Sequence, residues 1–411
     1  MSQTNNEGKN KSNKYSEKLK NYAKSDIIKK CSNCSMCRDV CPIYQIIKKE
    51  RSYPGGKFRV FRTFVEENLK IKEKFVEIMA LCSMCKHCEV VCPLDFSFTE
   101  ILEELRKEIV TKSNKPYKTQ EDFASKVQKD KNPYGESAGE RKKWVKGDIR
   151  EAKRSPYAYF VGCTSSYREV ISALNTAIVL SNILEDNFVL LGAEEYCCGS
   201  PLIRTGQVDF NLCLESDDKK KTKSHFDVAD YISHNVEVLK EKGVRIVIFN
   251  CSGCYKTAVK DWPKYYGGNL PFETFHLTEY VAKNLDLVEK KLKNWDKRIT
   301  YHDPCHLGRY MKIYDAPRKI LRAIDGVQLI EMKNSKECAM CCGAGGGLKG
   351  GFPEEALEIA KLRIREAENT GAEILATACV FCKRNLRDAA EALNSKITVL
   401  NIEDILTQLL V

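Results

Sequence analysis

The chain of 411 residues lacks any long hydrophobic run. No stretch reaches the roughly 20 consecutive apolar residues that a membrane-spanning helix needs. The most apolar stretch, 176–193, is interrupted by Glu185, Asp186 and Asn187. The first 20 residues are polar and lack the apolar segment of a secretory signal peptide. We therefore expect a cytoplasmic protein, in which regularly spaced cysteines are metal ligands or redox centres rather than disulfides.

The sequence also lacks the features of a nucleic-acid-binding protein. Its net charge is +11, yet basic and aromatic residues are not interleaved and no nucleic-acid module is present. The lysine excess is concentrated near the N-terminus, where residues 1–30 hold eight lysines and three acidic residues. We expect residues 1–25 to form a disordered tail; the alternative is attraction to an anionic partner or to a membrane surface.

Cysteine is the residue that the chain has in excess, with 20 in all. The run CxxCxxCxxxCP occurs twice, beginning at Cys31 and again at Cys82. This is the bacterial ferredoxin run, in which three thiols of one loop hold a cubane [4Fe–4S] cluster and the fourth reaches the other cluster. Zinc sites do not use this spacing. Site A then comprises Cys31, Cys34, Cys37 and Cys92, and site B comprises Cys82, Cys85, Cys88 and Cys41.

A second cysteine pattern also occurs twice. Each copy offers five thiols, which is one more than a closed zinc site uses. The adjacent pair within each copy would form a strained disulfide. Five converging thiolates instead suit a multi-iron cluster in which one sulfur bridges. Site 1 comprises Cys163, Cys197, Cys198, Cys251 and Cys254, and site 2 comprises Cys305, Cys341, Cys342, Cys379 and Cys382.

Hydrophobic periodicity divides the chain into a helical N-terminal part and a duplicated α/β part. Residues 26–112 form the two-cluster ferredoxin domain, with helical patterns at 62–81 and 102–110, and residues 113–155 are expected to be a linker over the surface. We expect two α/β domains, 156–297 and 298–411. Their expected strands are 157–161, 187–191 and 244–249, then 298–302, 327–331 and 372–376, with a helix at 167–184.

The thiols of sites 1 and 2 follow the carboxyl ends of these strands, the edge at which open α/β sheets bind ligands. The first copy carries an insertion near residues 207–224. Cys213, which lies in it, and Cys338 stand outside both patterns, and we expect ordinary thiols there. Gly345-x-Gly347-x-x-Gly350 fits the dinucleotide template but does not directly follow a strand. We expect these glycines to let backbone N–H groups approach cluster sulfurs.

The quoted cysteine patterns, with Tyr301-His-Asp-Pro-Cys-His-Leu-Gly-Arg309 and Cys341-Cys-Gly-Ala-Gly-Gly-Gly347, are those of CCG domains. With the ferredoxin runs in front, residues 25–411 resemble the D subunit of the CoB–CoM heterodisulfide reductase family. The resemblance implies a noncubane [4Fe–4S] cluster on each CCG copy. It also implies that the disulfide of coenzyme M and coenzyme B binds between the two clusters, each of which supplies one electron and captures one sulfur at an iron.

The same resemblance implies an electron-donor subunit, a membrane b-type cytochrome or a flavoprotein, through which the chain is peripheral on the inner face of the membrane. Both copies have all five cysteines, which favours a disulfide reductase. The alternatives are an electron-transfer subunit of a lactate- or glycolate-type dehydrogenase, or of a membrane redox complex that acts on a protein-borne disulfide or trisulfide.

Two histidines and several cations accompany the cysteines. His302 and His306 flank Cys305 and are candidates to supply protons near neutral pH, although either can be structural. Cations beside the thiols would suit an anionic substrate, but each is expected more often to be a solvated surface charge. They are Arg168, Arg204, Lys256, Arg309, Lys349 and Arg384.

Overall fold

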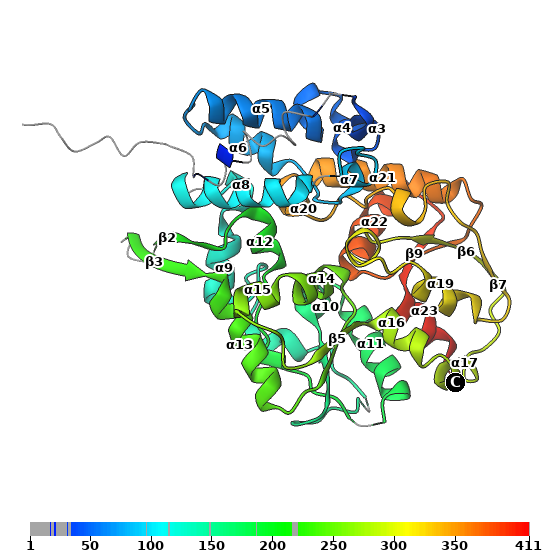
Figure 1. Cartoon of the computed structure of the whole chain (residues 1–411). Coiled ribbons are helices and arrows are strands. Elements are labelled where there is room, and N and C mark those ends of the chain that lie inside the picture. Colours follow the sequence, from blue (N-terminus) through cyan, green and yellow to red (C-terminus); the bar gives the residue numbers. More distant parts are fainter. Residues whose placement is uncertain are drawn as a thin grey trace, which may run out of the picture.

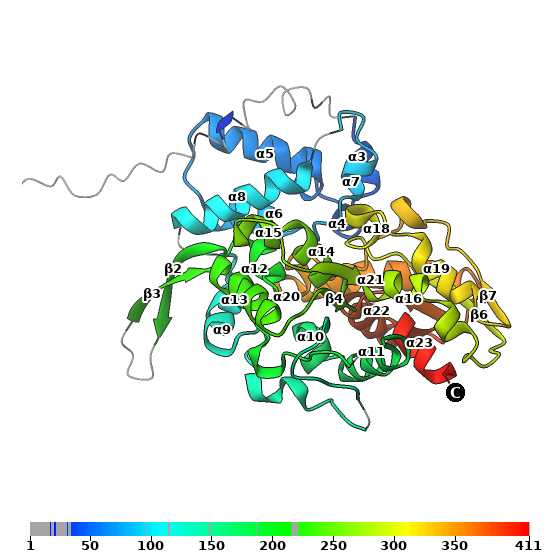
Figure 2. The same ribbon diagram turned by 60° about the horizontal axis from the view of Figure 1, so that its bottom comes forward.

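The computed structural model describes residues 17, 20, 21, 31, 34–95, 97–113, 116–147, 149–185, 187–215 and 221–410. The tail expected at residues 1–25 therefore lies, except for 17, 20 and 21, outside the described residues. Figures 1 and 2 show a layer of N-terminal helices lying on one side of a larger α/β body. The described part of the chain contains no helix with both the length and the hydropathy required to cross a bilayer.

The N-terminal layer is helical throughout. Its elements are α3 (Met36–Asp39), α4 (Pro42–Ile47), α5 (Pro54–Glu66), α6 (Glu73–Ala80), α7 (His87–Val90) and α8 (Phe98–Ser113). The helix expected over 62–81 is two helices, because Asn68 adopts a positive φ of 50° just after α5 and ends it. Aromatic and aliphatic side chains of α5, α6 and α8 form a separate core that includes Phe61, Phe75 and Leu102.

The first α/β half contains a parallel sheet in the order β1-β4-β5, from β1 (Tyr157–Phe160), β4 (Ile246–Phe249) and β5 (Glu273–His276). The strand expected at 187–191 contributes only isolated parallel bridges, one of which joins Val189 to Ala158 of β1. The helix expected at 167–184 is α11 (Val170–Ile183), which the short helix α10 (Gly162–Tyr167) precedes. The helices are α10 (Gly162–Tyr167), α11 (Val170–Ile183), α12 (Ser200–Thr205), α13 (Val228–Glu241), α14 (Ser252–Lys260), α15 (Trp262–Tyr266), α16 (Leu277–Lys283) and α17 (Asp286–Glu289).

The second half repeats this arrangement with a parallel sheet in the order β7-β6-β8-β9. Its strands are β6 (Lys297–His302), β7 (Val327–Leu329), β8 (Ile374–Thr377) and β9 (Thr398–Asn401). Its helices are α18 (Gly308–Met311), α19 (Asp315–Arg322), α20 (Leu348–Gly351), α21 (Pro353–Glu368), α22 (Val380–Ala392) and α23 (Ile402–Leu409). The bridged segment around Val189 occupies the place that β7 takes here, so the two sheets correspond strand for strand.

The insertion of the first copy forms an antiparallel ribbon of β2 (Asp209–Glu215) and β3 (Lys221–Asp227), which projects from the body in both views. The side chains of Phe210 and Phe226 are buried at its base. Cys213 lies on β2, and the polar turn at 216–220 lies outside the described residues.

The segment 113–155, expected to be a surface linker, is instead built into the α/β body. It contains η2 (Lys118–Gln120), α9 (Asp122–Asp130) and η3 (Ala138–Lys142). Ala124 and Val127 of α9 are fully buried, and Trp144 joins them in the same core. That core runs through both α/β halves without a break. The expectation was wrong because the apolar face of α9 consists of only two residues, Ala124 and Val127. The polar residues around them leave no apolar periodicity that the sequence could reveal.

Candidate redox site

The two ferredoxin runs exchange their fourth cysteines in space. Cys92 of the second run lines one small cavity together with Cys31, Cys34 and Cys37 of the first. Cys41 lines a second cavity with the first three cysteines of the other run, Cys82, Cys85 and Cys88. The structure therefore brings together the same two groups of four thiols that the spacing predicts for sites A and B. Cys34 of site A is exposed at the surface, whereas Cys85 of site B is buried.

The five thiols of site 1 meet one another inside the first α/β half. The sulfurs of Cys198 and Cys254 lie 3.4 Å apart. Cys197 hydrogen-bonds both Cys163 and Cys198, and Cys251 hydrogen-bonds Cys254, so the five thiols form one connected group. Hydrogen bonds from Cys197 and Cys254 lower the pKa of the Cys198 thiol well below its ordinary value, which favours the thiolate that a metal needs.

Site 2 repeats this geometry in the second half. The sulfurs of Cys342 and Cys382 lie 3.2 Å apart. Cys341 hydrogen-bonds Cys305 and Cys342, and Cys379 hydrogen-bonds Cys382. Hydrogen bonds from Cys341 and Cys382 lower the pKa of Cys342 well below its ordinary value. All ten of these cysteines are buried free thiols, and clustered thiols of this kind fit an iron–sulfur cluster better than they fit a disulfide or one zinc ion.

The glycine of each CCG triplet is required by the backbone. Gly199 has a φ of 88° and Gly343 a φ of 83°, a region that side chains with a Cβ rarely adopt. A Cβ on Gly343 would also lie 2.6 Å from the carbonyl oxygen of Ala356. In the first copy this turn leads directly into α12, so the cysteine pair is held at the end of a loop that packs against the body.

Contacts between thiols also join the separate sites. Cys251 of site 1 hydrogen-bonds Cys379 of site 2, so the two copies meet at their CxxC cysteines. Cys341 of site 2 hydrogen-bonds Cys85 of site B, and these two thiols pack with Cys305 in one small cluster. The order in space is therefore site A, site B, site 2 and site 1, an order that the sequence alone left open.

One cavity of about 480 Å³ lies over both CCG sites. Thiols of site 1 and site 2 line it, and its wall includes Phe123, Tyr134 and Phe381. The cationic side chains that line it are Arg204, Lys349 and Arg384, and no Asp or Glu is found among the described residues that line it. Phe123 and Tyr134 come from the segment expected to be a linker, and nothing in the sequence pointed to them.

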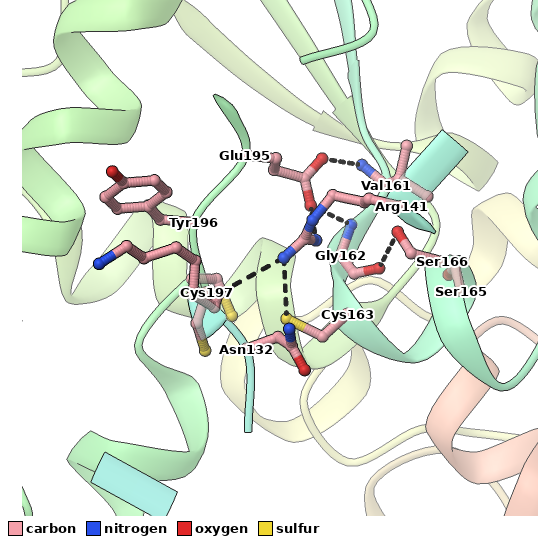
Figure 3. A network of polar contacts seen from close by, with 12 residues as sticks. Asn132, Arg141, Val161, Gly162, Cys163, Ser165, Ser166, Glu195, Tyr196 and Cys197 are labelled. Atoms are coloured by element: carbon pink, nitrogen blue, oxygen red, sulfur yellow. Dashed lines mark hydrogen bonds and ion pairs between the residues drawn. The ribbon is translucent and has the colours of Figure 1, made fainter. Parts of the chain in front are cut away.

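The first cysteine of each CCG site has a different neighbour. Cys163 of site 1 contacts a buried arginine, whereas Cys305 of site 2 packs against Cys85 of the ferredoxin layer. Arg141, from η3, is 1% exposed; it donates to Glu195 Oε1 at 2.7 Å and to Cys163 Sγ at 3.7 Å. Glu195 in turn accepts the backbone N–H groups of Val161 and Gly162, which fixes the Cys163 loop (Figure 3). The guanidinium thus lies beside Cys163 of site 1, whereas it is Cys341 of site 2 that contacts Cys85 of site B.

Two buried arginines and a half-buried tyrosine dock the ferredoxin layer against the body. Arg309 donates to the carbonyl oxygen of Cys85 at 2.6 Å, and Tyr310 donates to that of Met84 at 2.8 Å. Arg106 of α8 donates to five carbonyls in three parts of the chain, those of Met79, Ala80, Cys82, Arg204 and Gly346. The site B loop is thus held directly over Cys341.

The glycine run packs against the same junction. A Cβ on Gly346 would lie 2.5 Å from the carbonyl oxygen of Cys82, and a Cβ on Gly347 would lie 2.5 Å from Thr205. A Cβ on Gly350 would meet the ring of Phe123 at 2.5 Å. The glycines therefore allow three parts of the chain to approach closely, an explanation that differs from the approach to cluster sulfurs expected above.

Both candidate histidines are buried. Arg363 donates to His302 Nδ1 at 3.2 Å, and a ring nitrogen of His302 lies within 4.8 Å of the sulfurs of Cys342 and Cys382. His306 lines the cavity, and its Nε2 has no partner among the described residues. Burial lowers the pKa of each histidine to about 3. Both imidazoles are therefore neutral near neutral pH, which does not favour the expected role of these histidines as proton donors.

The expected surface charges divide into two classes. Arg204, Lys256 and Arg309 are at most 4% exposed, so for them the expectation of solvated charge was wrong. Asp261 pairs with both Arg204 and Lys256, and this ion-pair group is buried under the cavity because carboxylates neutralise it. Arg168, Lys349 and Arg384 are partly exposed.

Comparisons with known proteins agree with this arrangement. The cysteine-rich domain family matches residues 157–257 and 299–387, and the 4Fe-4S dicluster domain family matches residues 27–96. The chain is 38% identical to the D subunit of dihydromethanophenazine:CoB–CoM heterodisulfide reductase from Methanosarcina barkeri, over 92% of this chain and 93% of the relative. It is 28% identical to the B subunit of fumarate reductase (CoM/CoB) from Methanothermobacter marburgensis, over 95% of this chain and 74% of the relative.

A solved structure shares the fold. The crystal structure of a hypothetical protein from Helicobacter pylori superimposes with a TM-score of 0.55 at 12% identity, covering 95% of this chain and 75% of that one. At this identity the likeness concerns the fold alone.

Proposed function

The chain belongs to the family of heterodisulfide reductase D subunits, which are iron–sulfur subunits of oxidoreductases. On that premise, we propose that it reduces the CoM-S-S-CoB disulfide, or a close analogue, to two thiols. The observation that carries the proposal is the contact of Cys251 with Cys379, which places both CCG sites under one cavity. A disulfide bound there reaches both sites at once, and its cleavage needs two electrons.

The cysteines fit two cubane and two noncubane [4Fe–4S] clusters. When bound, these clusters supply single electrons and the iron that accepts the sulfurs of the cleaved disulfide. With the clusters bound, site A, which includes the exposed Cys34, would hold the cluster nearest to a donor subunit, a b-type cytochrome or a flavoprotein. The cluster on site B would lie between that cluster and site 2, because Cys85 contacts Cys341. Site 1 lies last in this series.

The protein's own side chains prepare the cavity for an anionic disulfide. Its apolar wall, which includes Phe123 and Phe381, excludes water from the thiols. His306 presents an unpartnered Nε2 to the cavity and is placed to hydrogen-bond a product thiolate. Because its imidazole is neutral, we assign it this binding role and leave proton supply to solvent at the cavity mouth.

The test is dye-coupled reduction of CoM-S-S-CoB by the purified, anaerobic, iron-reconstituted chain, scored by the free thiol released. We expect turnover together with on the order of 16 irons per chain, four for each cluster. A reproducible content near eight irons would remove the two noncubane clusters from the proposal. Full iron with no turnover would instead favour the electron-transfer subunit that the sequence leaves as the alternative.

Arg384 is expected to bind an anionic group of the substrate. Its guanidinium carbon lies 5.8 Å from the centre of the Tyr134 ring, and among the described residues it forms no ion pair. The other cavity cations are already neutralised: Lys349 pairs with Asp388 at 2.6 Å, and Arg204 pairs with Glu103 and Asp261. Arg384→Gln should raise the KM for the anionic disulfide about tenfold, the effect of losing one charge-assisted hydrogen bond.

The control for this variant is Arg365→Gln, which removes an exposed arginine on α21 outside the cavity lining. Steady-state kinetics with CoM-S-S-CoB and with an uncharged disulfide separate the two effects. Only the anionic substrate should respond to Arg384→Gln. An equal rise in KM for both disulfides would contradict recognition of charge at this position.

A further inference from the structure

Sites A and B are built from the same cysteine run but differ in the charges around them. Among the described residues, no lysine or arginine lines the cavity of site A, and Glu89 is one of its lining residues. The cavity of site B is lined by Lys57 and Lys86 and by no carboxylate. The difference lies in the protein surroundings, since the four predicted ligand cysteines line each cavity, and Cys88 of site B also lines that of site A.

Lys57 is the most unusual of these charges. It lies on α5, is 2% exposed, and its ammonium donates to the backbone carbonyl of Ile78. Among the described residues it has no carboxylate within ion-pair distance, whereas Lys86 pairs with Glu89 at 3.2 Å. No carboxylate in the described part of the chain therefore cancels the positive charge that a lysine ordinarily carries at neutral pH.

A second buried cation reinforces it. Arg106 is 4% exposed, and all of its hydrogen bonds go to backbone carbonyls, one of them the carbonyl of the site B ligand Cys82. Neither charge is neutralised by a direct ion pair. Uncompensated positive charge in a buried, low-dielectric setting stabilises whatever negative charge lies beside it.

We propose that Lys57, supported by Arg106, holds the reduction potential of the site B cluster above that of the site A cluster. Reduction adds one negative charge to a cluster, and a fixed cation beside it favours the reduced form. In the part of the chain that the structure describes, no such cation lines site A, and its Cys34 is exposed. The proposal rests on the cluster assignment made above and adds the direction of flow: an electron received at site A moves downhill to site B, next to Cys341.

The charge-neutral variant Lys57→Gln tests this role and retains an N–H donor for the Ile78 carbonyl. Redox titration of the anaerobic, cluster-loaded chain, followed by low-temperature EPR, gives the midpoint potentials of the two ferredoxin-type clusters. We expect the potential of the site B cluster to fall by about 59 mV, a tenfold change in its reduction equilibrium, while that of the site A cluster stays unchanged. Lys57→Arg, which keeps the charge, should restore the higher potential.

Two further variants calibrate the result. Lys86→Gln should lower the same potential by less, because Lys86 is 22% exposed and already paired with Glu89. Arg62→Gln removes a positive charge from the same helix, but its side chain is 43% exposed and faces Glu66, so it should move neither potential. A purely structural role for Lys57 would not produce this graded, charge-dependent series.

The unmodified chain provides a measurement that needs no variant. Cys34 exposes site A at the surface, so a soluble dysprosium chelate should relax the EPR signal of the site A cluster more than that of site B. The signal that appears first during reduction should be the less affected one. If it is the more affected one, or if Lys57→Gln leaves both potentials in place with full iron, the inference is overturned. Absence of ferredoxin-type signals in the unmodified chain would overturn the cluster assignment itself.

Discussion

Replacing Cys342 by serine is expected to abolish disulfide reduction. Cys342 is 3% exposed, its sulfur lies 3.2 Å from that of Cys382, and hydrogen bonds from Cys341 and Cys382 hold its pKa low. A serine hydroxyl is a hard donor that stays protonated. Site 2 therefore loses the thiolate that contacts both Cys341 and Cys382. Because site 2 is the CCG site in contact with site B, its loss also isolates site 1 from the electron supply.

Three measurements check this variant: thiol release from CoM-S-S-CoB, iron content, and low-temperature EPR. Turnover should fall to background, about four irons should be lost, and the signals of sites A and B should persist. Cys338→Ser is the matched control, because Cys338 lies four residues earlier, is exposed and belongs to no site. It should keep full activity. Loss of the site A and site B signals in Cys342→Ser would show that the sites are not independent as described.

Replacing Arg106 by methionine is expected to produce the largest loss of stability. The guanidinium of Arg106 donates to the carbonyls of Met79 and Cys82 in the ferredoxin layer and to those of Arg204 and Gly346 in the body. Among the contacts that the structure describes, no other side chain joins these four carbonyls. Methionine fills part of the space but leaves buried carbonyls without donors. Each unpaired group costs about 1–3 kcal/mol, and a loss on the order of 3–5 kcal/mol is expected.

The thermal midpoint of the anaerobic, cluster-loaded chain measures this effect, and limited proteolysis reports whether the ferredoxin layer detaches first. Lys107→Met is the control, since it removes a neighbouring positive charge from α8 at a partly exposed position. A thermal midpoint for Arg106→Met equal to that of Lys107→Met would contradict the docking role. Because Cys341 contacts Cys85 through this interface, the rate of site 2 reduction by a dye that reduces site A should fall as well.

The spacing of the cysteines is sufficient to predict the ligand groups. Sites A and B are each collected from short loops whose geometry the CxxCxxCxxxCP run imposes, and the duplicated CCG pattern follows strand ends that periodicity located. The spacing within each cysteine run and the periodicity of each strand depend on neighbours a few residues apart. The strands of the two α/β halves were located for the same reason, although the strand expected at 187–191 proved to be only bridges and the apolar face of α9 was missed.

Tertiary structure alone decided which sites touch. The contacts of Cys251 with Cys379 and of Cys85 with Cys341 join residues far apart in the chain, and their existence depends on how the layers pack. The burial of Arg204 and Arg309 and the position of Arg141 against Cys163 are likewise set by docking, because no local pattern distinguishes a buried arginine from an exposed one. The sequence by itself predicted which thiols belong to each site, and the packing of the layers decided the order of the sites and the charges beside them.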